Sequence, residues 1–370
     1  MKKLIKGLFI FSSLFVFTSC KQNKNEEKTE NTITIKDMQN RELTIDKTKT
    51  NRVICLGAGA LRYYSYIGDL NKIVAVEEID KTPFGVGTAL RPYYHANKDY
   101  FATLETCGKG GPAAQTADTE AILKNRPEII ISFLSAEANE TLQNTTNIPV
   151  VGLKQGTDGV FDELTHQSFT LLGKIFNKEE KASTLINYIN TVKTELLSLE
   201  ESDVTCYAGC IGNWGKTNLY GTYGDFPIFK YARVKDSTDL LQNKVANKQF
   251  STNAEDLLKL NPNKIFIDGA GYAQFKEAYN QDSTTFDALD AIKNGEVYHL
   301  LPYNAYYTNL EIQLMSTYYV ASLTHESLKD LNMENKGNEI LNAFLGKSFY
   351  KELLQYSTGS LGYSKLNLKD

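Results

Sequence analysis

Short apolar runs alternate with segments of helical periodicity along most of the chain. Three of these apolar runs have the length of buried strands: Val53–Leu56, Glu128–Phe133 and Lys264–Asp268. Each is part of a repeated order of apolar strand, loop and helical segment. The series also includes these apolar runs: Lys72–Glu77, Pro149–Leu153, Asp203–Ile211 and Glu296–Leu301. Strands that alternate with helices form parallel sheets with helices on both faces. The pattern therefore predicts an α/β fold.

Two other segments complete the predicted architecture. The alternating stretch Ile33–Ile45 predicts a β-hairpin, and Lys178–Leu199, with apolar residues three and four apart and no Gly or Pro inside, predicts a long helix. Such a helix spans roughly 30 Å, enough to join two lobes. We therefore predict two Rossmann-like lobes with parallel sheets, joined by a single long helix, with a ligand cleft between them. The predicted units are an N-terminal lobe (33–160), a connecting helical segment (161–201), a C-terminal lobe (202–330) and a C-terminal helical extension (331–370).

One short repeat occurs in each half of the chain. The segment Thr119–Pro127 reads TEAILKNRP, and Ala254–Pro262 reads AEDLLKLNP. Each is an amphipathic helix that has Glu at its second position, ends before Pro and leads into an apolar strand. The two segments fall at comparable points of the two halves, which indicates two lobes of like topology.

The first twenty residues have the composition of a targeting signal. Lysines near the start precede an apolar run from Leu4 to Phe17, and the small residues Thr18 and Ser19 precede Cys20. The run is too short for a membrane span and has the length of a signal-peptide core. It resembles a bacterial lipoprotein signal (1–19), in which Cys20 is lipidated, followed by a polar tether (20–32). We expect an extracytoplasmic protein held to a bacterial membrane by lipid; the alternative is a conventional secreted protein cut nearby.

Charge and motifs exclude several classes of function. The chain has 40 Lys and Arg against 44 Asp and Glu, a net charge of −4, and no dominant basic run, which argues against nucleic acid as a partner. It lacks Walker A, GxSxG and HExxH sequences and has only 4 His. These observations argue against a hydrolase or metalloprotease. The run Gly57–Arg62 mimics a dinucleotide fingerprint, but Arg62 replaces the third Gly. We interpret it as a tight strand-to-helix turn.

The cysteines beyond Cys20 are predicted to be buried free thiols. Cys206 and Cys210 lie four residues apart in one predicted strand, about 13 Å along its axis. A disulfide requires Cα atoms within about 7 Å, so this pair cannot form one. Cys55 lies inside another apolar strand.

In their order, these features resemble the class III substrate-binding proteins of ABC importers, which carry ferric chelates, haem and cobalamin. The resemblance rests on the lipoprotein signal and tether, the paired Glu-to-Pro helices, the long connecting helix, and the sequences TITIKDMQNRELTID and NRVICLGAGALRYY, and it extends from Ile33 to about Leu328. Asn40 stands where such proteins usually have Gly, a change that a turn tolerates. The resemblance implies a monomer without cofactor or enzymatic activity, whose partners are a permease and its ATPase. It also implies that Glu120 and Glu255 dock onto arginines of that permease.

Loops beyond the carboxyl ends of the strands are the predicted ligand site, as in other parallel α/β sheets. Arg suits oxygen anions, Tyr suits Fe(III) and planar chelates, and the glycine-rich Cys107–Pro112 can present backbone N–H groups to an anion. Tyr63, Tyr318 and Tyr319 are predicted to be core residues instead. The candidate ligand-binding residues are Arg62, Arg91, Tyr93, Tyr94, His95, Gly110, Gly111, Trp214, Tyr220, Tyr223, Tyr272, Tyr303, Tyr306 and Tyr307.

The leading hypothesis for function is capture of a metal complex, a ferric siderophore or other iron chelate, and its delivery to an ABC importer. Molybdate or tungstate held by Arg91 and Gly108–Pro112, and cobalamin or haem in a wide aromatic cleft, stay open as alternatives. A different class, an extracytoplasmic metal chelatase, would require a His–Glu pair, for which only His95 is well placed. A surface adhesin or signalling lipoprotein is the remaining alternative.

Overall fold

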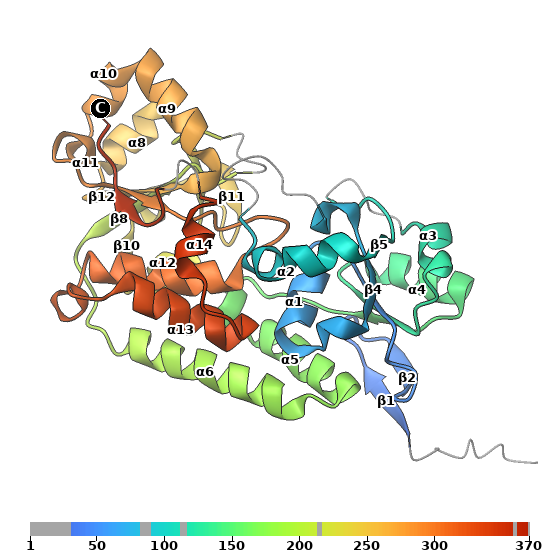
Figure 1. Ribbon diagram of the computed structural model, residues 1–370. Helices are drawn as coiled ribbons and strands as arrows, with labels where there is room; N and C mark the ends of the chain where they lie inside the picture. Colours follow the sequence, from blue (N-terminus) through green and yellow to red (C-terminus); the bar gives the residue numbers. More distant parts are fainter. Residues whose placement is uncertain (1–30, 82–89, 112–116, 213–216, 358–360, 369–370) are drawn as a thin grey trace, which may run out of the picture.

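The computed structural model describes residues 31–81, 90–111, 117–212, 217–357 and 361–368. It consists of two α/β lobes above a layer of long helices (Figure 1). The predicted signal peptide, Cys20, most of the tether and Trp214 lie outside the described residues. None of the helices within these ranges is both long and apolar enough to cross a membrane.

The N-terminal lobe begins with the predicted hairpin, β1 (Thr32–Lys36) and β2 (Glu42–Asp46), which pair antiparallel. Asn40 takes a left-handed conformation in its turn, with φ of 67°, as a residue in a Gly position must. A parallel five-stranded sheet follows, in the order β5-β4-β3-β6-β7. Its strands are β3 (Val53–Leu56), β4 (Ile73–Val76), β5 (Glu105–Thr106), β6 (Ile129–Ser132) and β7 (Val150–Gly152). The helices of this lobe are α1 (Ala60–Ile67), α2 (Pro92–Thr103), α3 (Thr119–Lys124) and α4 (Ala136–Thr146).

The C-terminal lobe repeats this plan with one antiparallel addition. Its sheet has the order β10-β8-β12-β13-β14, in which only β14 runs antiparallel among the described strands. The strands are β8 (Thr205–Gly209), β10 (Lys235–Asp236), β12 (Lys264–Asp268), β13 (Val297–Leu300) and β14 (Ser364–Lys365), with a separate ribbon of β9 (Gly221–Tyr223) and β11 (Gln249–Ser251). The helices are α7 (Pro227–Tyr231), α8 (Ala254–Leu260), α9 (Tyr272–Gln281), α10 (Ser283–Asp287) and α11 (Asp290–Lys293).

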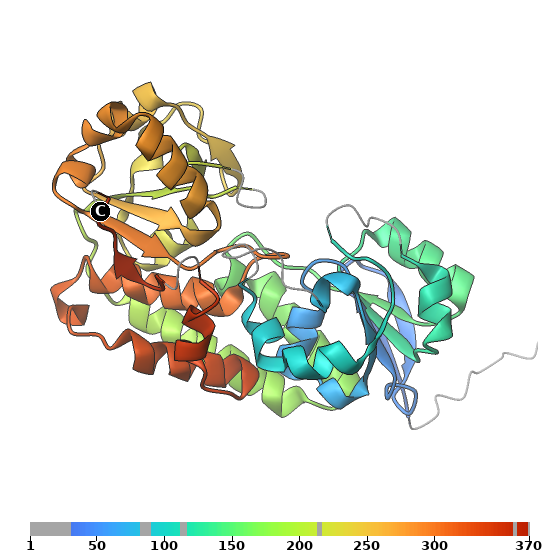
Figure 2. The same cartoon turned by 45° about the horizontal axis from the view of Figure 1, so that its top comes forward.

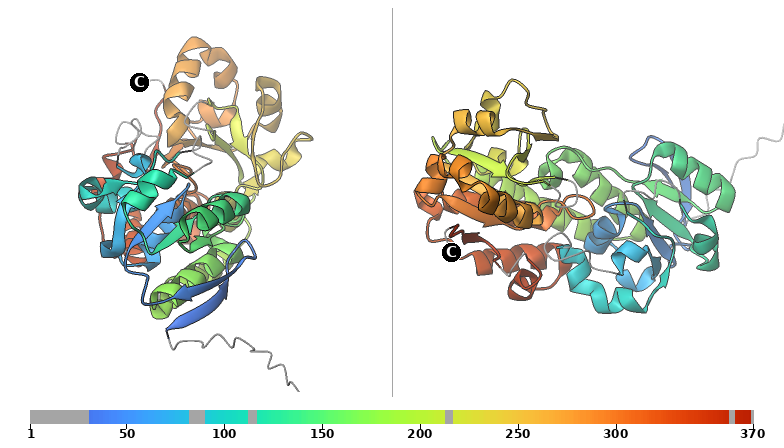
Figure 3. Two further views of the ribbon diagram at one scale, coloured as in Figure 1. Left: turned by 90° about the vertical axis from the view of Figure 1, so that its right-hand side faces the viewer. Right: turned by 90° about the horizontal axis from the view of Figure 1, so that it is seen from above.

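Helices from the middle and from the C-terminal part of the chain form the layer beneath the lobes. In the left view of Figure 3, the green helices and the blue hairpin lie together at the bottom of the molecule. The predicted connector is α6 (Glu179–Leu197), which buries one face. The other helices of the layer are α5 (Glu163–Phe176), α12 (Leu310–Ser322), α13 (Met333–Leu345) and α14 (Tyr350–Leu354).

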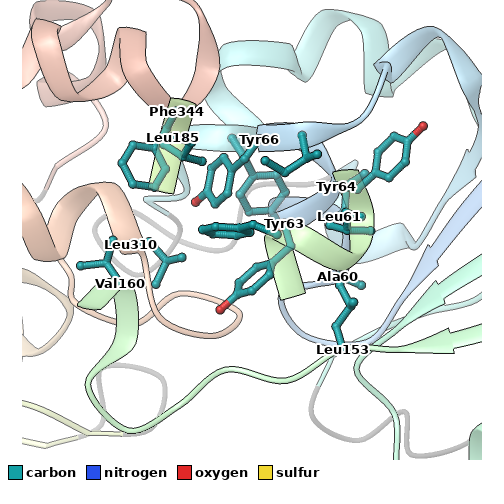
Figure 4. Close-up of a cluster of buried hydrophobic side chains, with 14 of the residues drawn as sticks. Ala60, Leu61, Tyr63, Tyr64, Tyr66, Leu153, Val160, Leu185, Leu310 and Phe344 are labelled. Carbon is teal, nitrogen blue, oxygen red and sulfur yellow. The ribbon is translucent and has the colours of Figure 1, made fainter. Parts of the chain in front are cut away.

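Helix α12 is shared by the cores of both lobes. Leu314 and Tyr318 pack into the cluster that contains the N-terminal sheet and α1, whereas Val320 and Ala321 pack into a C-terminal cluster. Figure 4 shows the first cluster, in which Tyr63 and its neighbours on α1 meet side chains from α6, α12 and α13. Because one buried helix serves both cores, the lobes are joined by more than the single connector predicted from the sequence. We expect only limited motion between them.

Two predicted segments differ from the structure. The predicted strand 203–211 is shorter, because Cys210 has φ of +67° and ends β8 at Gly209. The extension 331–370, predicted to be helical, also contains β14, which completes the C-terminal sheet. The prediction for the cysteines is confirmed: Cys55, Cys107, Cys206 and Cys210 are buried and unbridged.

Candidate ligand site

The carboxyl ends of the N-terminal strands form a pocket of about 290 Å³. Its wall comes from the loops that follow β3, β4, β5 and β6, the loops that sequence predicts to bind a ligand. The lining residues are Leu56, Glu77, Cys107, Gly108, Lys109, Gly110, Ala117, Asp118 and Leu134. Gly110 has φ of +65°, and a Cβ there would lie 2.8 Å from Cβ of Glu77. Only glycine therefore lets this turn close over the glutamate.

Glu77 is the buried charge of this pocket. Its carboxylate accepts hydrogen bonds from the backbone N–H of Gly57, at 3.1 and 3.2 Å, and from the hydroxyl of Tyr306, at 2.6 Å. Burial raises the pKa of Glu77 to about 7, and the nearby Asp80 acts in the same direction, while the hydrogen bonds from Tyr306 and Gly57 oppose the shift. The sequence carries one signal for Glu77: it is an acidic residue at the end of the apolar run Lys72–Glu77.

A loop of the C-terminal lobe lies on this edge of the N-terminal sheet. The segment 302–309, between β13 and α12, reaches across to the other lobe (Figure 2). The hydroxyl of Tyr306 bridges the lobes, since it donates to Glu77 and accepts from the backbone N–H of Gly111 at 3.1 Å. Tyr306 and Tyr307 have φ of 51° and 78°, a strained conformation for bulky residues that surrounding contacts must hold in place.

Arg62 is the main anchor of the 302–309 loop. Its guanidinium, fully buried in α1, donates to the carbonyl oxygens of Ala305 and Tyr306 at 2.7 and 3.0 Å, and to Oδ1 of Asn309 at 2.9 Å. Asn309 in turn donates to the carbonyl of Leu90 at 2.8 Å. Arg62 therefore holds one lobe to the other, a role that its predicted place in the ligand site did not anticipate.

Arg91 is also buried and bound to protein groups. It donates to the carbonyl of Ile79 at 2.8 Å and to Asp80 at 3.2 Å, and its guanidinium lies 4.8 Å from the ring centre of Tyr94. The hydroxyl of Tyr93 donates to the same oxygen of Asp80 at 2.5 Å. Burial raises the pKa of Asp80, although Arg91 and Tyr93 oppose the shift. Arg91, Tyr93 and Tyr94 thus lie inside the lobe rather than on the pocket wall, and contact with a ligand stays a prediction for them.

The structure brings some of the other candidates together and separates the rest. Gly110, Gly111 and Tyr306 meet at Glu77, and the exposed ring of Tyr307 lies beside them against Phe133, with 5.6 Å between ring centres. His95 is elsewhere: its ring stacks on that of Tyr356, in the turn after α14, with 3.9 Å between the ring centres.

The C-terminal candidates fall into two groups. Tyr220 lines a polar pocket of about 390 Å³ together with Thr217, Asn218 and residues of α9. Tyr223, Tyr272 and Tyr303 take part in internal contacts: Tyr223 donates to the carbonyl of Asn247, Tyr272 packs edge-on against His299, and Tyr303 packs against Phe226. The predicted core residues Tyr63, Tyr318 and Tyr319 are buried, which confirms that interpretation.

Within the described ranges, no three His, Cys, Asp or Glu residues cluster so that they could hold a metal ion. The two repeat glutamates are both at the surface. Glu120 lies in the first turn of α3, and Glu255 in the first turn of α8, where it pairs with Lys259 at 2.7 Å.

The raised pKa of Glu77 predicts a pH-dependent stability. Between about pH 4.5 and 7 the folded protein binds more protons at Glu77 than the unfolded chain does, so stability falls as the pH rises through this window. Glu77→Gln removes this titration. Urea unfolding measures the free energy of unfolding at about pH 5 and at about pH 8. The decrease between these two pH values should be smaller in the variant than in wild type, by at most about 3 kcal/mol.

The free energy of unfolding of Glu77→Gln should still fall with rising pH, but with a smaller slope than in wild type. Part of the slope remains because burial also raises the pKa values of Asp268 and Asp236, to about 7 and about 6. Glu78→Gln, at the exposed neighbouring position, is the matched control and should keep the wild-type slope. Equal slopes for Glu77→Gln and wild type would show that Glu77 does not titrate in this range.

Comparison with known proteins identifies the fold. No protein-family model matches the sequence, and neither does any curated protein. A periplasmic solute-binding protein of Veillonella parvula is similar in structure, with a TM-score of 0.66 and 15% identity over 89% of this chain and 97% of that one. The TroA-like binding protein FepB of the same species has a TM-score of 0.61 and 18% identity over 85% and 97% of the two chains. The molybdate-bound MolA of Haemophilus influenzae, part of an ABC transporter, has a TM-score of 0.61 and 16% identity over 85% and 98%.

These similar structures are solute-binding proteins, and the likeness covers nearly all of each of them. The chain has the two-lobed α/β fold of periplasmic solute-binding proteins. The fold class predicted from the sequence is thereby confirmed.

Proposed function

We propose that this chain is the substrate-binding component of an ABC importer and that its cargo is an iron(III) chelate. The observation that carries the proposal is the pocket at the carboxyl edge of the N-terminal sheet, on which a loop of the other lobe lies. The pocket wall belongs to the N-terminal lobe, and the other lobe reaches it through the hydrogen bond from Tyr306 to Glu77, an arrangement that suits capture and release of a solute. The likeness to solute-binding proteins supports binding rather than catalysis.

The charges of the pocket favour a chelate over a free oxyanion. Molybdate or tungstate needs arginines and unoccupied backbone N–H groups. Arg62 and Arg91 instead donate to protein groups, and the N–H of Gly111 already donates to Tyr306. The wall holds two carboxyl groups, those of Glu77 and Asp118, against one basic side chain, that of Lys109, a balance that disfavours a free anion. A chelate that brings its own ligands for iron needs none of these groups. Tyr307, which packs against Phe133 next to the pocket residue Leu134, is 42% exposed and is the aromatic side chain that we propose contacts it.

We further propose that the protein works outside the cytoplasm, anchored by a lipid on Cys20, as a monomer. The importer's permease would receive it through Glu120 and Glu255, one exposed carboxylate on each lobe. The like position of the two residues in the repeat supports this assignment over a chance pair of first-turn glutamates.

Calorimetric titration of residues 21–370 tests the choice of cargo. The panel contains ferric siderophores, ferric citrate, haem, cobalamin, molybdate and tungstate, and the fluorescence of the single Trp214 is followed in parallel. Saturable binding of a ferric chelate is expected. The iron-free form of the same siderophore is the matched control and should bind more weakly.

If molybdate alone binds, the cargo is an oxyanion and the proposed iron(III) chelate is wrong. If haem or cobalamin alone binds, the cargo is a macrocycle. No heat of binding across the panel would contradict the proposed cargo classes altogether.

A further inference from the structure

Two surface leucines occupy equivalent positions in the two lobes. Leu123 on α3 is 46% exposed and Leu258 on α8 is 41% exposed. Leu123 lies three residues after Glu120, and Leu258 lies three residues after Glu255. Over the described ranges, the large hydrophobic side chains that are this exposed are few: Leu123, Leu164, Leu197, Leu240, Val245, Leu258, Tyr307 and Tyr356.

Helices α3 and α8 expose equivalent positions to solvent. The residues just before the leucines, Ile122 and Leu257, are both buried, so each helix turns the same face inward. Residues three apart on a helix are neighbours on its surface. Each lobe therefore displays a carboxylate beside an isobutyl group. Neither leucine belongs to a buried core cluster, and each leaves more than two fifths of its surface in contact with water.

The acidic part of this surface is available to a basic partner. Glu255 is paired only across the surface with Lys259, and both side chains are mostly exposed. Exposed pairs of this kind are weak, so an arginine from a partner can compete for the carboxylate. A partner that fits both lobes must offer the same combination twice: a basic side chain and an apolar hollow next to it.

We propose that Leu123 and Leu258 are the apolar contacts of this docking surface and that its occupant is the pair of membrane-embedded subunits of the importer. The inference rests on the proposed function and adds to it: docking combines charge with burial of one leucine on each lobe. Contacts between charges weaken with salt, whereas burial of leucine does not. The leucines therefore supply the part of the affinity that persists at high ionic strength.

Photo-crosslinking in cells tests the contact directly. A benzophenone amino acid is placed at 123 or 258 in the full chain, and at 164 or 197 as matched controls, because Leu164 and Leu197 are 40% and 43% exposed but lie on α5 and α6. Mass spectrometry of the adducts should identify ABC permease subunits from 123 and 258 but not from 164 and 197. Adducts with a second copy of this chain, or the same adducts from all four positions, would overturn the proposal.

A double variant gives a second measurement. Leu123→Ser with Leu258→Ser should lower cargo uptake by about tenfold or more and leave cargo affinity unchanged. Leu164→Ser with Leu197→Ser, which loses a similar buried surface, should lower the melting temperature to a similar extent and transport normally. In membranes, the leucine variant should keep the wild-type salt dependence of docking. Normal uptake by the leucine variant, with uptake lost in a Glu120→Arg, Glu255→Arg variant, would refute the role of the leucines and leave the proposed function standing. Normal uptake in both variants would refute the docking surface itself.

Discussion

Replacing Arg62 by alanine is expected to lower the free energy of unfolding by about 3–5 kcal/mol. The guanidinium is fully buried and donates three hydrogen bonds to the 302–309 loop. Burial raises the pKa of Glu311 on α12, and the positive charge of Arg62 opposes this rise. The alanine variant would leave two carbonyl groups, an amide oxygen and this carboxyl group without their cation. Urea unfolding followed by circular dichroism measures the loss.

Arg52→Ala is the matched control for that experiment. Arg52 also donates to two backbone carbonyls, those of Asn125 and Arg126, at 2.7 and 2.8 Å, but it is exposed to solvent. Water replaces its hydrogen bonds, so its loss should lower the free energy of unfolding by about 1 kcal/mol or less. Equal losses in the two variants would contradict the assignment of Arg62 as the anchor between the lobes.

The pairing of Arg62 with the 302–309 loop could not be predicted from the sequence. The partners lie more than 240 residues apart, with a separation of 244 positions between Arg62 and Tyr306. An arginine after a strand is usually a candidate for a ligand site, and only the packed lobes show that this one is enclosed by protein groups. Arg91 is likewise enclosed by protein groups, since it pairs with the buried Asp80, 11 positions earlier in the chain.

The sheets were predictable because apolar runs of strand length mark buried parallel strands. Two of the predicted strands, β3 and β12, match the structure residue for residue. The long helix α6 was predictable from its unbroken periodicity. Strand β14 was not, because two residues carry no pattern and pair only once the C-terminal sheet exists. Helix α12 is buried on all sides, so it lacks the polar face that reveals an ordinary surface helix.

The pocket was predictable in place but only partly in composition. The rule for parallel sheets located the loops that form it. Gly108, Gly110 and Gly111 take positive φ, but the N–H of Gly111, predicted to face an anion, donates to the hydroxyl of Tyr306. The strained Tyr306 and Tyr307 were chosen for their ring chemistry, whereas in the structure the hydroxyl of Tyr306 ties the loop to Glu77. That contact depends on the docking of one lobe against the other, which no local pattern contains.

The proposed docking through Glu120 and Glu255 gives the largest expected effect on function. Glu120→Arg with Glu255→Arg should lower uptake by about a hundredfold or more, because each substitution places two positive charges face to face at the permease. Glu137→Arg with Glu326→Arg is the matched control: both residues are exposed near helix starts, and Glu326 has a lysine partner as Glu255 does. It should transport normally.

The most direct test of the account is an uptake assay with the radiolabelled cargo identified by titration. Cells that lack this chain are supplied with wild type, with the Glu120→Arg, Glu255→Arg variant or with the control variant. The account predicts that wild type and the control variant restore uptake, and that the Glu120→Arg, Glu255→Arg variant binds the cargo with wild-type affinity and fails to deliver it. Full uptake by that variant, or uptake that does not depend on this chain at all, would contradict a role as the binding component of an ABC importer.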